Sequence, residues 1–531
     1  MHQPLPIIPK PDSVTFQAGF FVIDTNAAVS SPPGAERAAD LIQKLTGLAS
    51  IAHQGQIRFV LKPTIRGEEA YHLDVDESGI EIRASSTAGL FYGAQTLRQL
   101  LPAGVENGTS AAPYEIPYLH IEDAPRFPYR GFMLDVSRHY FGVDEIKRML
   151  DLLALHKMNR LHWHLTDDQG WRIEIKQYPR LVEVGSLRKE TQVAGWLLSK
   201  PVYDGKPYAG YYTQAEIREV VAYAAKNFIE VIPEIGSPGH FTAAMAAYPQ
   251  LSCAGMPVEV RTSVTTFSKP LCVGNEFVFE FLENVFSEIV DLFPSGYIHI
   301  GGDEVNKKEW KKCPHCQRRM VAEGLKNGHD LQAYFENRLA ALLKARGSRI
   351  IAWSEVLHDN LDPEIINQFW FFANRRKTIA ELKKGRKTIV SDFSRLYLDY
   401  SYRVMELIRT YQFEPQFAGI NAVQASSILG IEAPLWTEYV ASRARMDWQT
   451  FPRITALSET AWTPKDGRDY DDFLVRLAYF EKRLDALGVQ HATRECYLKH
   501  SLLSKIPFVL KVLFSGEHPG EAEYKQFHQP T

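Results

Sequence analysis

Residues 299–305 read HIGGDEV and place two carboxylates, Asp303 and Glu304, directly after two glycines. In a regular strand, neighbouring side chains point to opposite faces of the sheet, so adjacent acids that share a task require a break in strand geometry. Glycine permits that break because it has no Cβ. The stretch therefore predicts a strand that ends here and delivers two acids with different tasks to one pocket. The alternative is that both acids are solvated.

Apolar stretches with the character of buried strands recur along the chain on either side of HIGGDEV, and most are followed by helical spacing of apolar residues. Counting the strand that leads into HIGGDEV, the eight candidates are GFMLDVS (131–137), RLHWHLTDD (160–168), FIEVIPEIGSPGH (228–240), YIHIGGDE (297–304), RIIAWSE (349–355), INQFWF (366–371), KTIVSD (387–392) and GIEAPLWTE (430–438). This alternation predicts an α/β fold, a (β/α)8 TIM barrel. An open Rossmann-like sheet is the alternative, but no glycine-rich phosphate turn follows the first strand.

Polar and aromatic residues collect at the C-terminal ends of these strands, which form the catalytic face of a barrel. The residues at or just beyond the strand ends are Arg138, Asp167, His240, Asp303, Glu304, Trp353, Trp370, Asp392, Trp436 and Glu438. Each one alone has a structural explanation, but ten at one rim favour a functional site.

The barrel is predicted to follow a smaller domain. Residues 71–85, YHLDVDESGIEIRAS, alternate apolar and polar residues across a turn, and residues 86–101 then change to helical spacing. We therefore expect a small α+β domain over residues 1–125, a (β/α)8 barrel over 126–510 and a C-terminal tail over 511–531.

The composition is that of an ordinary globular protein. Of the 531 residues, 45% are hydrophobic and 23% are charged, and the formal net charge of −3 argues against a nucleic-acid partner. No apolar run is long enough to span a bilayer. The first residues do not form a signal peptide, so the localisation stays open between a cytoplasmic protein and an exported one whose signal has been removed.

Two groups of residues raise the question of a metal. Cys313 and Cys316 form CPHC, but a single CxxC without a second pair nearby is weak support for zinc, and a local disulfide or two free thiols is the better interpretation. Cys253 and Cys272 flank a loop that they could bridge in an exported protein. His162 and His164 have one-face spacing in mid-strand, which favours packing in the barrel interior over metal binding.

Several carboxylates and tryptophans without an obvious metal cluster indicate glycoside chemistry. Acids cleave the acetal bond, and aromatic rings stack on the apolar face of a sugar.

Six motifs, in order along the chain, carry a resemblance to a known family. GFMLDVSRHYF, HWHLTDDQGWRIEI, VIPEIGSPGH, HIGGDEV, YLDY and APLWTE closely resemble the β-N-acetylhexosaminidases of glycoside hydrolase family 20. The resemblance covers nearly the whole chain, from the α+β domain through the barrel.

The resemblance implies an exo-acting, retaining hydrolase of terminal β-linked GlcNAc, and of GalNAc, in which the substrate's 2-acetamido oxygen is the nucleophile and an oxazolinium ion is the intermediate. Glu304 matches the general acid/base, and Asp303 matches the residue that orients the acetamide and stabilises the charge on its nitrogen. Asp167 and His240 match a relay that contacts Glu304, and Tyr397 matches a donor to the acetamide oxygen.

The same matching assigns the residues that hold the sugar. Arg138, Glu438 and Asp399 match contacts to the hydroxyls, and Trp353, Trp370 and Trp436 match the acetamide pocket and the platform beneath the ring. The implied partner is an oligosaccharide or glycoconjugate with a terminal N-acetylhexosamine. No cofactor and no metal is implied, and a homodimer stays open.

Two regions have no counterpart in the motifs. Residues 306–320, NKKEWKKCPHCQRRM, are expected to form a solvated loop and helix near the entrance, and residues 187–213 form a long loop in which the reach of Trp196 is open. Two other functions remain as alternatives: a relative that releases a disaccharide, and a carbohydrate-binding protein without catalysis. Asp399 and Glu438 argue against the first, and the intact catalytic set argues against the second.

Overall fold

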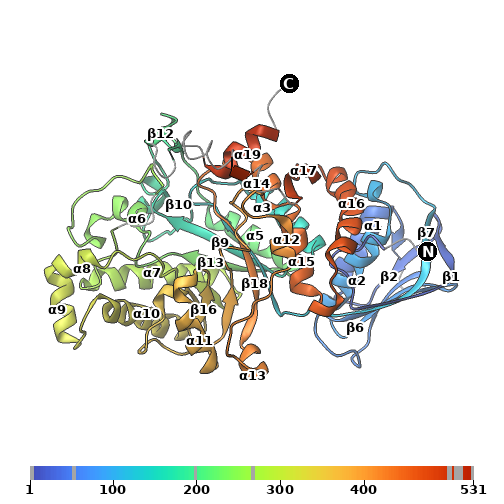
Figure 1. Cartoon of the computed structure of the whole chain (residues 1–531), viewed down its shortest axis with the longest axis horizontal. Coiled ribbons are helices and arrows are strands. Elements are labelled where there is room, and N and C mark those ends of the chain that lie inside the picture. The colour runs from blue at the N-terminus through green and yellow to red at the C-terminus, as the bar shows by residue number, and fades with distance from the viewer. Residues whose placement is uncertain are drawn as a thin grey trace.

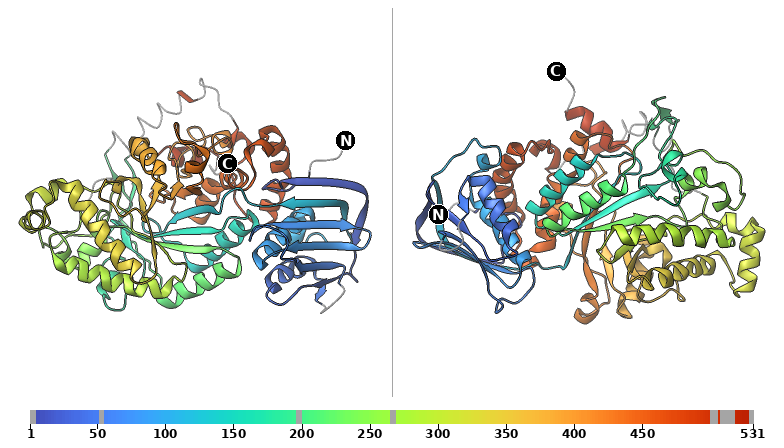
Figure 2. Two further views of the ribbon diagram at one scale, coloured as in Figure 1. Left: turned by 90° about the horizontal axis from the view of Figure 1, so that it is seen from below. Right: turned by 180° about the vertical axis from the view of Figure 1, so that it is seen from behind.

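A computed structural model of the protein describes residues 5–50, 55–195, 200–264, 269–498, 505–506 and 518–527. A sheet domain forms one end of the molecule and a larger barrel the other, with helices from the C-terminal part of the chain between them (Figure 1). Two further views show the same separation of the N-terminal sheet from the barrel (Figure 2). No helix in the described part of the chain is long and apolar enough to cross a membrane.

The N-terminal domain contains a seven-stranded sheet in the order β1-β7-β5-β6-β4-β2-β3. Its strands are β1 (Ser13–Ile23), β2 (Ala28–Ser30), β3 (Ala49–Ser50), β4 (Ile57–Leu61), β5 (Tyr71–Asp76), β6 (Gly79–Ala84) and β7 (Tyr114–Asp123). The predicted hairpin is present, because β5 pairs with β6 in antiparallel register across the turn before Gly79. A small α+β domain before the barrel is therefore confirmed.

Helices α1 (Glu36–Thr46) and α2 (Thr87–Leu100) lie on the side of this sheet that is turned toward the barrel (Figure 1). Helix α2 begins at Ser86, whose side chain accepts a hydrogen bond from the backbone of Gly89. It packs closely on the sheet at Gly93, where a Cβ would lie 2.4 Å from the Ile82 side chain. Almost all of α2 is buried, as expected for a helix packed on more than one side.

Eight parallel strands close the barrel in the order β8-β9-β13-β14-β15-β16-β17-β18, and β18 pairs back onto β8. They are β8 (Tyr129–Asp135), β9 (Arg160–Asp167), β13 (Glu230–Ile235), β14 (Tyr297–His299), β15 (Arg349–Trp353), β16 (Ile366–Phe369), β17 (Thr388–Val390) and β18 (Ile428–Leu435). All eight predicted strands are present, and the (β/α)8 prediction is confirmed. Most of their residues are buried, as expected for strands covered on both faces.

Helices surround the barrel, although the alternation with strands is incomplete. The main outer helices are α3 (Val143–Leu155), α5 (Gln214–Lys226), α7 (Glu276–Leu292), α10 (Gly328–Lys344), α11 (Arg375–Lys383), α14 (Arg443–Thr450), α15 (Arg453–Trp462) and α16 (Tyr470–Ala486). Between β15 and β16, residues 354–365 contain a single 3-10 turn, Ser354–Val356, instead of an α-helix. That short connection keeps the residues after β15 at the rim.

The connections between the strands carry shorter elements. These are β10 (Gly170–Trp171), α4 (Arg180–Glu183), β11 (Gln192–Ala194), β12 (Val202–Tyr203), α6 (Thr242–Ala247), α8 (Lys308–Lys312), α9 (Pro314–Ala322), α12 (Leu407–Tyr411) and α13 (Ala422–Ala425). After the barrel, α17 (Arg494–Tyr497) and α19 (Pro519–Phe527) follow, and Glu523 of α19 accepts hydrogen bonds from the backbone of Tyr402 and Arg403. Part of the predicted C-terminal tail therefore packs on the barrel.

Candidate functional site

One pocket of about 260 Å³ lies at the C-terminal ends of the barrel strands. Ten of the residues singled out from the sequence line it: Arg138, His240, Asp303, Glu304, Trp353, Trp370, Tyr397, Asp399, Trp436 and Glu438. Of the other two, Asp167 lies behind His240, and Asp392 does not line the pocket. The pocket brings together residues at or after the ends of seven of the eight strands, all except β9, and this convergence identifies it as the candidate active site.

The HIGGDEV stretch leaves strand geometry immediately after β14. Gly301 and Gly302 have φ values of +74° and +94°, and Glu304 has a φ of +50°. A Cβ on Gly302 would lie 2.2 Å from the Val356 side chain, so only glycine fits there. The break in the strand lets Asp303 and Glu304 line the same pocket. A non-glycine residue with positive φ at this point is strained, as is common at functional sites.

A line of polar contacts runs from the barrel floor to the acids. Asp167 Oδ1 lies 3.1 Å from His240 Nδ1, and His240 Nε2 lies 3.5 Å from Glu304 Oε2 and 3.8 Å from Asp303 Oδ2. His240 follows the turn after β13 and has a φ of +53°, so a second strained residue faces the first across the pocket. The imidazole is thus placed between one buried carboxylate and the two acids of the pocket.

The charges along this line depend on each other. Burial opposes ionisation of Asp167, but Arg138 and His240 outweigh it and hold the pKa of Asp167 well below its usual range. Burial likewise lowers the pKa of His240, but Asp167, Asp303 and Glu304 together raise it well above its usual value. Burial raises the pKa of Asp303 to about 7, although His240 acts in the opposite direction. The charged imidazolium of His240 therefore lies beside Asp303 and Glu304, and the surroundings of these two acids differ.

Arg138 is fixed by three acidic partners. Its guanidinium contacts Asp167 at 2.8 Å, Asp135 at 3.2 Å and Glu438 at 3.7 Å. It also lies 5.1 Å from the centre of the Trp436 ring. Asp135 is itself held by the backbone and hydroxyl of Thr437. The arginine is therefore oriented before any ligand arrives, with its exposed edge toward the pocket.

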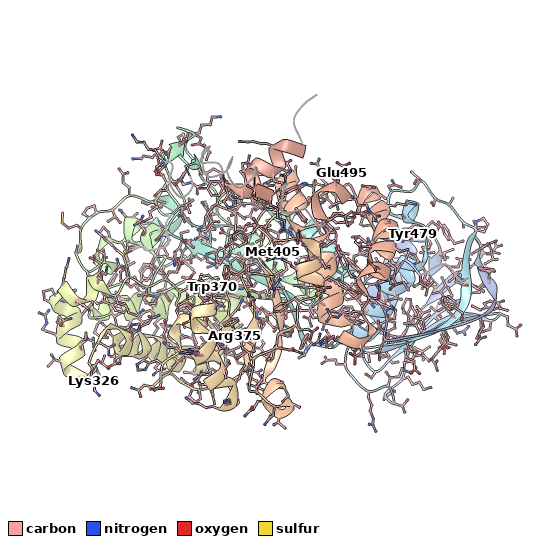
Figure 3. All side chains as sticks on the ribbon, viewed as in Figure 1. Lys326, Trp370, Arg375, Met405, Tyr479 and Glu495 are labelled. Carbon is pink, nitrogen blue, oxygen red and sulfur yellow. The ribbon has the colours of Figure 1, made fainter. Side chains whose placement is uncertain are left out.

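Aromatic side chains form the walls. Trp370 and Tyr397 are stacked with ring centres 6.1 Å apart, and Trp436 lies 6.2 Å from Trp353 and 6.3 Å from Tyr397. Trp353 is anchored by a 3.0 Å hydrogen bond from its indole to Glu234. Figure 3 labels Trp370 on the barrel, away from the N-terminal sheet. Such a box of flat apolar surfaces suits the faces of a sugar ring and its acyl substituent.

Burial raises the pKa values of two carboxylates away from His240. Burial and the nearby Glu438 raise the pKa of Asp399 to about 8, and burial also raises the pKa of Glu438 against the effect of Arg138. Within the described part of the chain, Asp399 Oδ1 has no hydrogen-bond partner although it is buried. A protonated carboxyl can both donate and accept, which matches the requirement of a hydroxyl group.

The sequence did not single out several residues that support the site. Glu355 accepts hydrogen bonds from the Trp370 indole at 2.9 and 3.0 Å, and burial raises its pKa to about 8. It ends the stretch RIIAWSE, so the rule applied to the other strand ends would have found it. Tyr439 and His518 also line the pocket, with rings stacked 4.6 Å apart. No local pattern announces His518, which reaches the pocket from the far end of the chain.

The two mid-strand histidines lie in the barrel interior, as predicted. His164 bridges Glu234 at 2.7 Å and Asp167 at 2.9 Å, and His162 lies 2.9 Å from both Glu234 and Glu432. His162 and Glu234 together with His299 have the spacing of a metal-binding group. Since each of these contacts is a direct pairing of ring nitrogen and carboxylate oxygen, we interpret them as a hydrogen-bonded floor beneath the pocket.

Two predictions about the rim need correction. Asp392 follows β17 but does not reach the pocket, because its carboxylate turns back to accept hydrogen bonds from the backbone and hydroxyl of Ser394. Residues 306–320 form α8 and α9, and none of them lines the pocket. Trp310 of this segment is fully buried and donates to the carbonyl of Leu271, so the segment is not simply solvated. Trp196 lies outside the described residues.

Of the expectations about the cysteines, the free state of Cys313 and Cys316 is confirmed, whereas the absence of a second pair nearby is wrong. The sequence suggested that CPHC lacks a second pair, but Cys253 and Cys272 lie beside Cys313 and Cys316. The sequence also allowed a bridge between Cys253 and Cys272 in an exported protein, yet Cys272 Sγ lies 3.6 Å from Cys313 Sγ, and all four thiols are free. Cys272 and Cys313 are 41 residues apart, with α7, β14 and α8 between them, so spacing along the chain does not encode their proximity.

The sequence matches the family model described as glycosyl hydrolase family 20, catalytic domain, over residues 127–465, and the model described as domain 2 of that family over residues 5–124. Among curated proteins, a beta-hexosaminidase of Porphyromonas gingivalis is 42% identical over 439 residues, which cover 80% of this chain and 54% of that protein. The chain thus spans about half the length of this relative. A beta-hexosaminidase of Akkermansia muciniphila is 34% identical over 428 residues, covering 78% of this chain and 83% of that one.

Solved structures agree with these matches. The exo beta-N-acetylglucosaminidase of Vibrio harveyi, in complex with N-acetylglucosamine, superposes with a TM-score of 0.82 at 32% identity and covers 92% of this chain and 79% of that one. A mutant Streptomyces plicatus beta-hexosaminidase in complex with product (GlcNAc) gives a TM-score of 0.81 at 32% identity, with 94% and 98% of the two chains covered.

Proposed function

The chain belongs to glycosyl hydrolase family 20, and from its pocket we propose that it is an exo-acting, retaining β-N-acetylhexosaminidase. Its substrates would be glycans that end in β-linked GlcNAc, and also GalNAc. One observation carries the proposal: adjacent acids, Asp303 and Glu304, share one small aromatic pocket with a buried histidine between them and a third carboxylate. The volume of about 260 Å³ is below the ~300–1,000 Å³ of ordinary ligand pockets, which suits a single terminal sugar.

In the proposed first step, the acetamido oxygen of the substrate forms a bond to the anomeric carbon as the bond to the leaving oxygen breaks. Glu304 gives its proton to that leaving oxygen, and the sugar becomes an oxazolinium ion. The His240 imidazolium, 3.5 Å from Glu304, stabilises the carboxylate that remains. In the second step water attacks the anomeric carbon and loses a proton to Glu304, while the bond between that carbon and the acetamido oxygen breaks and the acetamide is restored. The configuration is therefore retained after two inversions.

Asp303 has a different task in this scheme. Positive charge grows on the acetamide nitrogen, and an ionised carboxylate beside it would be stabilising. The pKa of Asp303 is raised by burial to about 7 without substrate, so the carboxylate is poised near its midpoint at neutral pH. The developing cation favours its ionised form. Tyr397 would donate its phenol to the acetamide oxygen and hold it in attack geometry.

The rest of the pocket would hold the sugar. Arg138 and Glu438, 3.7 Å apart, would share a hydroxyl. Asp399 would offer another hydroxyl its buried Oδ1, which has no hydrogen-bond partner among the described residues. Trp436 and Trp353 would form the platform and the acetamide wall. Because these polar groups line the same small pocket as the acids, their contacts to the sugar hydroxyls would favour removal of one terminal residue over release of a disaccharide.

The test uses paired aryl β-glycosides, one with a 2-acetamido group and one with a 2-hydroxyl, each with and without a thiazoline mimic of the oxazolinium ion. We expect hydrolysis of the acetamido substrates in both the gluco and galacto series, with tight inhibition by the mimic. Equal hydrolysis of the 2-hydroxyl substrate without inhibition would instead indicate a protein carboxylate as nucleophile and would refute the proposal. Proton NMR of the first-formed sugar checks retention independently.

A further inference from the structure

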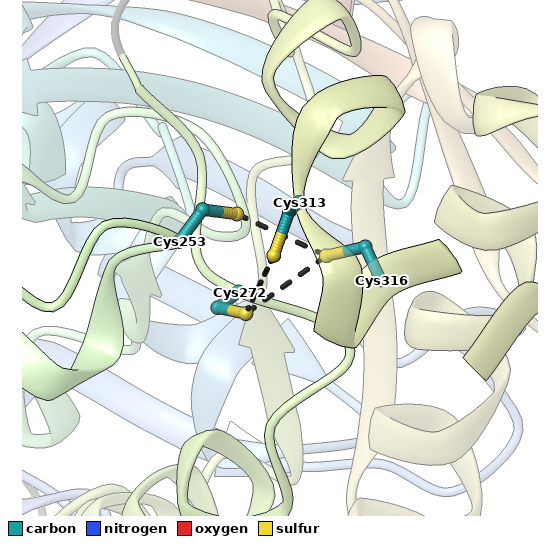
Figure 4. Close-up of side chains that lie close together, drawn as sticks. All are labelled: Cys253, Cys272, Cys313 and Cys316. Carbon is teal, nitrogen blue, oxygen red and sulfur yellow. Dashed lines mark hydrogen bonds between the residues drawn. The ribbon is translucent and has the colours of Figure 1, made fainter. Parts of the chain in front are cut away.

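Four cysteines from three segments of the chain gather outside the pocket. Cys313 and Cys316 lie at the start of α9, and Cys253 and Cys272 lie in the loop between α6 and α7. Their thiols point toward one another from these segments (Figure 4). All four Sγ atoms lie within 4.8 Å of each other.

The distances between the sulfurs match a metal better than a disulfide. Three of the separations between sulfur atoms are 3.6 Å for Cys272–Cys313, 3.8 Å for Cys253–Cys316 and 3.9 Å for Cys272–Cys316. A tetrahedral Zn²⁺ with Zn–S bonds of about 2.3 Å has sulfurs about 3.8 Å apart, whereas a disulfide requires about 2.05 Å. Moreover, Cys316 has two sulfur neighbours at nearly equal distance, which a pairwise bond does not explain. We propose that these cysteines form a structural Zn²⁺ site.

The backbone around the thiols is shaped for close approach. Cys313 is the N-cap of α9, Pro314 occupies the first position, and Cys316 lies one turn on, so both thiols leave the helix start on one side. Gly274, two residues after Cys272, packs directly against this helix start. A Cβ there would lie 2.1 Å from the His315 carbonyl carbon and 2.3 Å from the Cys316 nitrogen. Any other residue would push the two pairs of cysteines apart.

Burial and charge also suit the ion. Cys272, Cys313 and Cys316 are at most 3% exposed, and Cys253 is partly exposed. Four thiolates around Zn²⁺ carry a net charge of −2, since four negative charges are offset by two positive ones. The surrounding sequence, NKKEWKKCPHCQRRM, supplies several lysines and arginines to balance that charge, and most of these lie on the surface. The charge of the zinc site would thereby explain why this segment is basic.

The site would tie together two walls of the sugar pocket. The loop between Cys253 and Cys272 carries Val264, which lines the pocket. Leu271, next to Cys272, donates its backbone N–H to the carbonyl of Pro238, two residues before His240. On the other side, α8 and α9 continue the chain that leaves Glu304. A metal here clamps the base of both segments without touching the sugar, so the inference does not depend on which sugar is cleaved.

The direct test is the metal content of the untagged full chain, purified without chelators and measured by inductively coupled plasma mass spectrometry. We expect about one zinc per chain in the wild type, less than a tenth of that in Cys313→Ser/Cys316→Ser, and full content in Cys496→Ser. Cys496 is the matched control because it is a buried cysteine outside the cluster.

A second readout does not rely on variants that fold poorly. Wild-type protein loaded with Co²⁺ should show thiolate-to-cobalt charge-transfer absorption and the visible bands of tetrahedral cobalt, both abolished by added zinc. Protein freed of zinc should expose four additional reactive thiols and unfold at a temperature several degrees lower. Metal-free wild type that does not take up zinc or cobalt, or disulfides Cys272–Cys313 and Cys253–Cys316 found by peptide mapping after purification under reducing conditions, would overturn the proposal.

Discussion

Two buried groups of charged residues in this molecule differ in how their charges are balanced. At the contact between the N-terminal domain and the barrel, Lys157 Nζ lies 2.8 Å from both Asp123 and the Tyr71 hydroxyl, and the Trp462 indole donates to the other oxygen of Asp123 at 2.8 Å. Nearby, Arg130 holds Glu69 through two contacts of 2.7 and 2.8 Å. Every carboxylate in this interface cluster has a cation opposite it.

The pocket instead places carboxylates beside carboxylates. Burial raises the pKa of Asp303 to about 7 and that of Asp399 to about 8, and neighbouring acids add to both. In the interface cluster burial acts in the same direction on Glu69, but Arg130 outweighs it and lowers the pKa. The comparison teaches that burial alone does not mark function. A functional site is indicated where no opposite charge offsets the effect of burial on a pKa, because the group can then take up or release a proton during a reaction.

Residues with positive φ also have different positions in the two regions. Lys157 and Phe228 have positive φ values but lie just beyond the ends of α3 and α5, where a left-handed residue is common. His240 and Glu304 have positive φ values after strands, within the pocket. The first pair ends helices, and the second pair directs side chains into the candidate active site.

The largest effect is expected for Glu304→Gln. The glutamine side-chain amide cannot donate the proton that a poor leaving group needs, so kcat on such substrates should fall by roughly 10²–10⁴-fold. The fall should be smaller for an aryl leaving group that departs without a proton. Steady-state kinetics on both substrates check this, with the exposed Glu77→Gln as control. Equal activity of wild type and Glu304→Gln on the poor leaving group would contradict the assignment.

Lys157→Met tests the other side of the comparison. The substitution leaves Asp123 buried without a cation, which should lower the free energy of unfolding by about 3–5 kcal/mol. Urea denaturation measures the loss. Lys344→Met is the control, since Lys344 pairs with Glu364 on the surface and should change stability by less than about 1 kcal/mol. A double variant Lys157→Met/Asp123→Asn should recover part of the loss, and no recovery would mean that the ion pair is not the cause.

Asp303→Asn should reduce kcat by roughly 10²–10³-fold, because the oxazolinium nitrogen loses an anionic partner. The same change should leave stability at acidic pH nearly unaltered, since a protonated Asp303 and an asparagine carry no charge. Rates of the acetamido aryl glycoside and thermal unfolding at pH 5 provide the two measurements. A variant with a near wild-type rate would show that Asp303 does not stabilise the intermediate.

The smallest effect is expected for Asp399→Asn, which should remove a pH dependence of stability that the wild type has. The folded pKa of Asp399 is about 8, above the unfolded value of about 3.9, so the folded protein retains a proton that the unfolded chain releases. The stabilisation is complete below the unfolded pKa and is lost as pH rises through the folded pKa.

Relative to Asp399→Asn, the wild type should therefore lose on the order of 1 kcal/mol of unfolding free energy between pH 5 and pH 8.5, after allowance for solvent access. Thermal or urea unfolding of both proteins at the two pH values measures the difference. A constant difference across this range would mean that the carboxyl is already ionised in the folded protein.

Much of the site could be predicted because strand ends in a barrel meet at one face. Asp303, Trp353, Trp436 and Glu438 each follow an apolar strand, and the rule that places them together needs no other information. The rule failed for Asp392, whose side chain is captured by Ser394 in its own turn. It was not applied to Glu355, which follows Trp353 by two residues.

The sequence by itself determined which residues form strands and at which end their polar side chains gather, because apolar runs and the breaks after them are local properties of the chain. Only the tertiary structure decided which titratable groups lie close enough to affect each other's proton binding, and which thiols gather in one place. The position of His240 between Asp167 and Glu304, and of Cys272 between Cys313 and Cys316, depends on segments tens of residues apart. Proximity and burial set pKa values and ligand geometry, and neither quantity is written in spacing along the chain.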